Sequence, residues 1–103
     1  MRKKILLVDD DPFHQEFGQD VLRANGYEVL LLNDCQDLDV FMDTVLTFLP
    51  DLILIEHHLK NVCGMDLVRR VRLHWVTANV PVVYYGSVED IAGLAEEAGA
   101  DAF

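Results

Sequence analysis

Three carboxylates that follow two apolar runs are the side chains of this sequence best suited to chemistry. Asp9 and Asp10 come directly after the apolar residues 5–8, and Glu56 comes directly after residues 52–55. A charged group at the end of a buried strand is costly unless it faces a wet crevice. In open α/β sheets that crevice lies at the carboxyl ends of the strands. Glu56 is therefore the first candidate, the alternative being that it only marks where a strand surfaces.

The elements that must position these carboxylates alternate along the chain. Short apolar runs bounded by turn residues predict buried strands, and they cover residues 3–8, 27–32, 52–55, 80–85 and, as the start of a fifth strand, 100–103. Helical patterns between them begin near Asp11-Pro12, Asn33-Asp34, Gly64 and Ser87. Compact β-α-β units of this kind predict a parallel sheet with helices on both faces.

A flavodoxin-like sheet order of 2-1-3-4-5 would make the strands at 3–8 and 52–55 neighbours. Asp9, Asp10 and Glu56 would then converge. Two carboxylates about 5 Å apart repel by roughly 3 kcal/mol at an effective dielectric near 20. A cation such as Mg²⁺ or Ca²⁺, or a proton on one carboxyl, would relieve that repulsion. The alternative is an exposed acidic loop that solvates the sheet edge.

Size and charge restrict the classes of function. The 103 residues, 51% of them hydrophobic, are expected to form one domain over 1–103. A net charge of −10 disfavours nucleic acid and anionic membranes as direct partners, and it suits basic protein faces or a divalent cation. Cys35 and Cys63 lack metal-ligand spacing, so we expect reduced thiols in a cytoplasmic protein without a membrane span.

Four motifs in order and at matching spacing resemble the receiver domain of bacterial response regulators in two-component signalling. They are ILLVDDDP at 5–12, PDLILIE at 50–56 with Gly64 eight residues after Glu56, VPVVYYGS at 80–87 and AGADAF at 98–103. The resemblance covers the whole chain and implies the flavodoxin-like order given above. It also implies that the sequence stops within strand five, so that the domain is incomplete at its C-terminus and a fifth helix is missing.

The resemblance assigns the metal-binding and phosphoacceptor positions. In receivers the acidic pair helps to bind Mg²⁺, and here Asp9 and Asp10 occupy it. The phosphoacceptor is an Asp that takes a phosphoryl group from a histidine kinase, and here the position holds Glu56. The backbone carbonyl of His58 matches a further Mg²⁺ ligand. We expect Mg²⁺ binding to be weak, because the longer Glu56 crowds the metal position.

Departures from the family pattern also fall on the switch positions. A Thr or Ser hydroxyl that holds the phosphoryl group is replaced by Gly86, with Ser87 one place later. Phe103 matches the aromatic switch position on strand five. The lysine that binds phosphoryl oxygens in receivers would fall just beyond Phe103, and Lys60 replaces the proline four residues after the acceptor.

These departures from the family pattern indicate an atypical receiver domain, also called a pseudo-receiver. We expect a phosphorylation-independent module that acts by protein contacts, with a histidine kinase or an output or effector domain as partner and a homodimer as a further option. The first alternative is a phosphoacceptor receiver in which Glu56, natural or engineered, mimics the charged state. A less favoured alternative is a Mg²⁺-dependent phosphatase in which His57 or His58 supplies an acid. We expect no enzyme activity.

Two further expectations concern packing. Without a fifth helix, apolar positions such as Val21 and the side chains of the strand at 80–85 would stay open, which favours self-association or lower stability. Trp75 and His74 are expected to pack half-buried at the end of the third helix.

Overall fold

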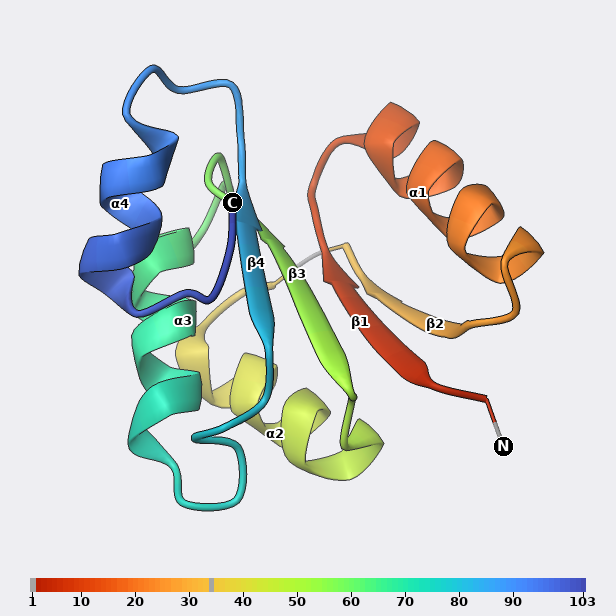
Figure 1. The fold of residues 1–103 in the computed structure, drawn as a ribbon, viewed down its shortest axis with the longest axis horizontal. Helices are drawn as coiled ribbons and strands as arrows, with labels where there is room; N and C mark the ends of the chain where they lie inside the picture. The colour runs from red at the N-terminus through yellow and green to blue at the C-terminus, as the bar shows by residue number, and fades with distance from the viewer. Residues whose placement is uncertain (1, 34) are drawn as a thin grey trace.

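The computed structural model describes residues 2–33 and 35–103. Within them, strands and helices alternate along the whole chain (Figure 1). Their bounds are β1 Lys4–Val8, α1 Pro12–Ala24, β2 Glu28–Leu32, α2 Leu38–Phe48, β3 Leu52–Glu56, α3 Gly64–Leu73, β4 Val82–Tyr85 and α4 Ile91–Ala98. No helix in this described part has the length and apolar content needed to cross a membrane.

The sheet is parallel and has the strand order β2-β1-β3-β4, which confirms the predicted order of these four strands. The predicted fifth strand forms only an isolated parallel bridge, between Val83 and Ala102. The Tyr84 amide donates to the Ala102 carbonyl over 2.9 Å, so this segment lies beside β4, where strand five was expected.

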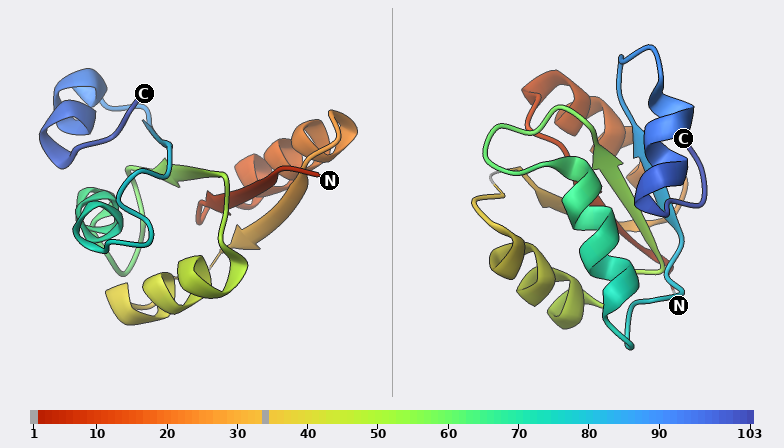
Figure 2. Two further views of the ribbon diagram at one scale, coloured as in Figure 1. Left: turned by 60° about the horizontal axis from the view of Figure 1, so that its bottom comes forward. Right: turned by 90° about the vertical axis from the view of Figure 1, so that its left-hand side faces the viewer.

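The two faces of the sheet are covered unequally. Helices α2, α3 and α4 lie on one side and α1 lies alone on the other (Figure 2). Alternate strand residues pack with α2, α3 and α4 into the main core, among them Leu6, Val8, Ile53, Ile55, Val82 and Tyr84. On the opposite side no residue of α1 is buried, and Phe13, Phe17 and Val21 are 72%, 63% and 43% exposed.

The first two helices, α1 and α2, each begin after an aspartate that caps them. The Asp11 carboxylate accepts hydrogen bonds from the amides of Phe13 and His14, and Pro12 takes the first helical position, as predicted. The predicted start of the second helix at Asn33-Asp34 is wrong for Asn33, while Asp34 lies outside the described residues. Helix α2 begins at Leu38 because Asp37 is its cap, accepting from the Val40 amide over 2.8 Å.

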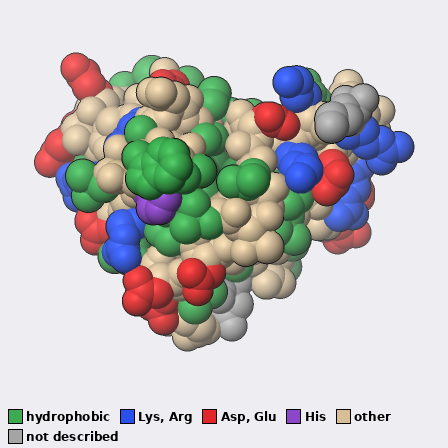
Figure 3. All heavy atoms as spheres, turned by 90° about the horizontal axis from the view of Figure 1, so that it is seen from below, with side chains coloured by type: hydrophobic (Ala, Val, Ile, Leu, Met, Phe, Trp, Pro, Cys, Tyr) green, Lys and Arg blue, Asp and Glu red, His purple; other side chains and the backbone are tan. Residues whose placement is uncertain are grey.

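The end of α3 differs from the expectation of half-buried packing. Trp75 is 87% exposed, with Leu73 and Val76 also exposed beside it, while His74 is half-buried. Hydrophobic side chains gather on this lower end of the molecule when it is seen from below (Figure 3). The chain forms a turn here before β4, and the buried Thr77, whose hydroxyl donates to the Val71 carbonyl over 2.8 Å, anchors that turn in place of the tryptophan.

Candidate functional site

The carboxyl ends of β1 and β3 bring two of the predicted carboxylates together. Val8 pairs in register with Ile55, so Asp9 and Glu56 leave adjacent strands at the same edge. Both side chains are buried, Asp9 at 0% and Glu56 at 6% relative exposure. They line a cavity of about 450 Å³, and its lining residues are Asp9, Asp11, His14, Glu56, His58, Tyr85, Gly86 and Ser87.

Asp9 is held by neutral donors on both oxygens. Its Oδ1 accepts from the Asp11 amide over 2.9 Å, and its Oδ2 accepts from the Tyr85 hydroxyl over 2.6 Å. Burial raises the pKa of Tyr85, and the hydrogen bond to Asp9 and the negative charges of Asp9 and Glu56 raise it further. Tyr85 therefore stays a protonated donor to Asp9.

Glu56 is oriented by the loop that follows it and by the open space at Gly86, which has no side chain. Its Oε1 accepts from the His58 amide over 3.0 Å. An ideal Cβ built on Gly86 would lie 2.9 Å from the same Oε1. His58 thus contacts the site through its amide, while the predicted role of its carbonyl as a metal ligand stays a prediction.

Asp10 takes a different orientation from Asp9. Its Oδ2 accepts from the Lys60 amide over 2.7 Å, which fixes the loop after β3 against the loop after β1. Its Oδ1 is buried and has no hydrogen-bond partner. Asp10 is not among the residues that line the cavity with Asp9 and Glu56. The buried carboxylate oxygens of Asp9 and Glu56 are nevertheless of the ligand type that suits the Mg²⁺ implied by the sequence.

His14 is a site residue that the sequence analysis missed. Its Nδ1 lies 3.5 Å from Asp9 Oδ2. One ligand atom each from Asp9, His14 and Glu56 lie within 4.8 Å of one another. The helix start could have indicated this residue: with Asp11 as N-cap, His14 falls in the first turn of α1, at the edge where β1 ends.

Tyr85 is a second site residue that the sequence analysis missed. Its position as the last residue of the predicted strand could have indicated it.

A second tyrosine contact lies on the opposite face of β4. Tyr84 is fully buried, and its hydroxyl lies 2.5 Å from His57 Nδ1. Burial, with added effects from Cys63 and Glu56, raises the pKa of Tyr84 to about 12. The two tyrosines therefore alternate across the strand, as the sequence indicates, and each contacts a different part of the site edge.

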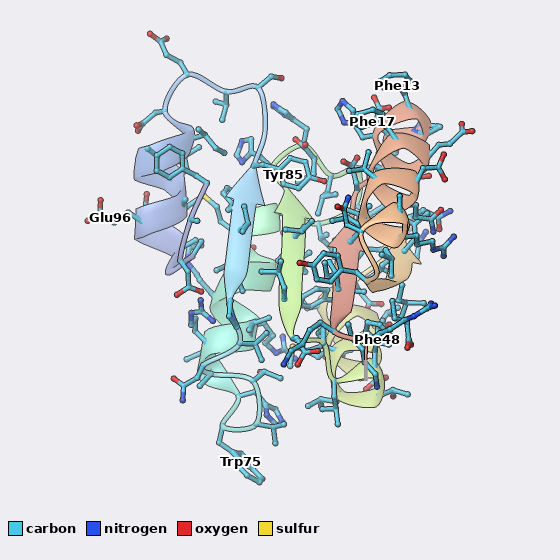
Figure 4. The ribbon with its side chains drawn as sticks, turned by 45° about the vertical axis from the view of Figure 1, so that its right-hand side comes forward. Phe13, Phe17, Phe48, Trp75, Tyr85 and Glu96 are labelled. Carbon is cyan, nitrogen blue, oxygen red and sulfur yellow. The ribbon has the colours of Figure 1, made fainter. Side chains whose placement is uncertain are left out.

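The predicted switch positions are only partly brought together. Gly86 and Ser87 line the cavity, but Phe103 does not and is 67% exposed. Tyr85 lies at the upper end of the sheet and lines one hollow together with Phe17 of α1, whereas Trp75 lies at the opposite end (Figure 4). A switch role for Phe103 stays a prediction.

This fold and this acidic edge are those of a signalling receiver. Residues 5–103 match the family model "Response regulator receiver domain", and the chain belongs to that family. The DNA-binding response regulator MtrA of Mycolicibacterium smegmatis is 33% identical over 98% of this chain, which corresponds to 42% of MtrA. The chain thus spans less than half the length of the curated relatives that it matches.

Solved structures agree with the assignment. A putative response regulator from Chloroflexus aurantiacus is 30% identical, with a TM-score of 0.87 over 99% of this chain and 83% of that one. The receiver domain of the sensor histidine kinase PA1611 from Pseudomonas aeruginosa, solved with a magnesium ion in its active-site cleft, has the same fold. It is 24% identical, with a TM-score of 0.84 over 99% of this chain and 83% of that one.

Proposed function

We propose that this receiver domain signals without phosphorylation, as a protein-binding module rather than an enzyme. The observation that carries the proposal is the contact between Glu56 and the position of Gly86. Glu56 Oε1 lies 2.9 Å from where a Cβ at position 86 would be, so the carboxylate fills the space of a switch side chain.

The chemistry of phosphoryl transfer argues in the same direction. Aspartyl phosphorylation needs a carboxylate nucleophile aligned with the donor phosphorus. Glu56 is one methylene longer than aspartate, and a misplacement of about 1 Å can cost on the order of 10²-fold in rate. Gly86 offers no hydroxyl to the transferred oxygens, and losing one such donor typically costs a further factor of roughly 10²–10³.

Mg²⁺ binding is part of the proposal. Asp9, Asp10 and Glu56 supply oxygen ligands, with the His58 carbonyl as the expected fourth. Mg²⁺ demands near-ideal octahedral geometry. Glu56 is already bonded to the His58 amide, and Asp10 to the Lys60 amide, so the metal must compete with fixed contacts. The proposed affinity is therefore weak.

The proposed partners are proteins, namely a histidine kinase or an output or effector domain. The net charge of −10 supports a basic protein surface as partner and opposes direct nucleic-acid binding by this domain. A homodimer through the exposed apolar side of α1 is a further proposal. We also propose a cytoplasmic location, as is usual for two-component receivers.

Incubation with acetyl phosphate and Mg²⁺, followed by intact-mass measurement, tests the proposal. We expect no gain of a phosphoryl group by the unmodified chain and little gain by Glu56→Asp. The double variant Glu56→Asp with Gly86→Thr should label faster than either single variant, most of all in a chain continued past Phe103 to carry the receiver lysine. Thermal unfolding of each variant controls for folding. Stoichiometric labelling of the unmodified chain would overturn the proposal.

The alternative function, a phosphoacceptor receiver in which Glu56 mimics the phosphorylated state, is favoured by one observation. Glu56 Oε1 extends toward Gly86, the direction in which a phosphoryl group would lie. If Glu56→Asp alone labels at an ordinary receiver rate, this alternative replaces the first.

A further inference from the structure

The hydroxyl of Tyr84 lies where β4, the first turn of α3 and the loop 57–63 meet. We propose that Tyr84 is a positioning residue: its hydroxyl donates to His57 Nδ1 and caps α3, and it thereby sets the loop that brings backbone amides to the acidic edge. The inference goes beyond the proposed function, because it holds whether or not Glu56 accepts a phosphoryl group.

The loop 57–63 reaches the carboxylates through two backbone amides, those of His58 and Lys60. The His58 amide donates to Glu56 Oε1 over 3.0 Å, and the Lys60 amide donates to Asp10 Oδ2 over 2.7 Å. The side chains of His58 and Lys60 are exposed, so the loop backbone places these two residues and packing of their own side chains does not. What fixes the ends of the loop therefore also fixes these two loop amides.

The start of the loop is held by the Tyr84 hydroxyl. Tyr84 is fully buried, and its hydroxyl oxygen lies 2.5 Å from Nδ1 of the half-buried His57. A buried hydroxyl whose proton has no acceptor is costly, and His57 Nδ1 is the acceptor beside it. Tyr84 therefore donates, which leaves the proton of a neutral His57 on Nε2.

The end of the loop meets the same tyrosine. Gly64 begins α3, and a Cβ on it would lie 2.9 Å from Tyr84 Cε1 and 2.7 Å from the Glu56 carbonyl oxygen. A real Cβ does not approach other atoms that closely, so glycine lets this end of the loop close on the ring and on β3. Between the two ends, Leu59 and Val62 pack partly against the main core. The loop thus starts and ends at Tyr84.

The first turn of α3 has an unusual cap. Cys63 is the N-cap residue, but within α3 its side chain makes no capping hydrogen bond. Burial raises the pKa of Tyr84, and a hydrogen bond from the Met65 backbone lowers it in part. The Tyr84 oxygen therefore accepts from the second residue of α3, whose amide an N-cap side chain commonly binds. One hydroxyl donates to the start of the loop and accepts from the helix that follows it.

The two adjacent tyrosines of β4 therefore act on different groups. Tyr85 contacts a carboxylate directly, through its 2.6 Å hydrogen bond to Asp9. Tyr84 acts at one remove, through His57 and the loop amides that follow it. This difference gives the test a matched control within the same strand.

Tyr84→Phe tests the assignment, because it removes the hydroxyl and keeps the ring. Neither metal nor phosphodonor is added, so failure here is separate from failure of the proposed function. Histidine ring NMR at mildly alkaline pH, where imidazole is neutral, should show the His57 proton on Nε2 in the unmodified chain and on both nitrogens in the variant. Hydrogen exchange of the His58, Lys60 and Met65 amides should be about tenfold faster in the variant.

Tyr85→Phe is the matched control, since this side chain lies on the opposite face of β4. It should leave the ring form of His57 and the exchange rate of the Met65 amide unchanged. The amide of Leu6, a core residue of β1, reports opening of the whole fold. In Tyr84→Phe its exchange should accelerate less than that of the two loop amides.

Two further variants separate the two contacts of the hydroxyl. Cys63→Ser supplies the side-chain oxygen that N-cap positions favour. In the Tyr84→Phe background it should restore the slow exchange of the Met65 amide but not the ring form of His57. His57→Ala should speed exchange of the two loop amides as much as Tyr84→Phe does, and the double variant should add no further loss, because both changes remove one contact.

An unchanged ring form of His57 in Tyr84→Phe would overturn the proposal. Acceleration of the Leu6 amide equal to that of the two loop amides would also overturn it, because the hydroxyl would then support the whole fold and not the loop. A third contrary outcome is unchanged exchange of the loop amides in His57→Ala, and this variant decides the matter if Tyr84→Phe fails to fold.

Discussion

The carboxylate of Glu56 and the missing side chain of Gly86 share one space, because a Cβ on Gly86 would lie 2.9 Å from Glu56 Oε1. A real Cβ does not approach an oxygen that closely, so one of the two groups must move if residue 86 gains a side chain. The longer acid and the glycine are therefore complementary features of this site.

This complementarity predicts energetic coupling between the two positions. Gly86→Ala should lower the free energy of unfolding by about 1–3 kcal/mol when Glu56 is present, because it overpacks the site. The same change should cost less in a Glu56→Asp background, with a coupling of at least about 0.5 kcal/mol. The contact of the new Cβ with His57, also 2.9 Å, is common to both backgrounds and cancels. Urea unfolding of the four proteins measures the cycle, and strictly additive costs would refute the coupling.

Mg²⁺ binding is predicted to saturate only in the millimolar range. Asp10 and Glu56 already accept backbone hydrogen bonds. These bonds restrict how the two carboxylates can arrange around an octahedral Mg²⁺. Amide NMR shifts near Asp9 should follow the titration, with Asp9→Asn as the control that abolishes it. Trp75 is a poor reporter, because it lies at the opposite end of the domain from Tyr85 (Figure 4). Saturation at micromolar Mg²⁺ would contradict this prediction.

Self-association is predicted from the open side of α1. A hollow of about 400 Å³ there is lined mainly by apolar side chains, including Leu7, Phe17, Val21 and Leu54. Phe17 is 63% exposed and stacks on Phe13, which is 72% exposed, with ring centroids 6.3 Å apart. Exposed apolar groups of this kind favour association. Sedimentation should show concentration-dependent dimers.

Phe17→Gln should shift the chain toward monomers. Trp75→Gln is the matched control, since Trp75 is 87% exposed but lies far from the α1 side. A monomer of high thermal stability at all concentrations would count against the prediction, as would equal effects of the two substitutions.

Alkaline pH should destabilise the fold through its buried tyrosines. The pKa of Tyr84 is raised to about 12 from its ordinary value of 10.0, mainly by burial, and the pKa of Tyr85 is raised too. The folded chain therefore holds these protons more tightly than the unfolded chain. Their contribution to stability is full below pH 10 and is lost as pH rises from 10 toward 12.

Chemical unfolding over this pH range measures the effect. In Tyr84→Phe the fall in unfolding free energy with pH should be shallower than in the unmodified chain. The ultraviolet tyrosinate signal should show that Tyr84 ionises late. A slope unchanged by both Tyr84→Phe and Tyr85→Phe would disprove the assignment.

Much of the fold could be predicted from the order of residue types. Apolar runs of strand length, Asp11-Pro12 at a helix start and Pro50 after a helix indicated the alternation and the parallel order. These are local preferences that act within a few residues, and they fix which strand ends on a carboxylate. The convergence of Asp9 and Glu56 followed from that order, because parallel neighbours end at the same edge.

Tertiary structure alone decided which groups share the cavity. Tyr85 lies 76 residues further along the chain than Asp9, and only packing brings its hydroxyl within 2.6 Å of that carboxylate. His14 is close to Asp9 in sequence, but its 3.5 Å approach to the carboxylate also depends on how α1 packs beside the sheet. Asp9 and Asp10 are identical in type and adjacent in sequence, yet they bond to different distant donors, the Tyr85 hydroxyl and the Lys60 amide. Trp75 stayed exposed because the buried Thr77 anchors its turn, a choice that no local pattern specifies.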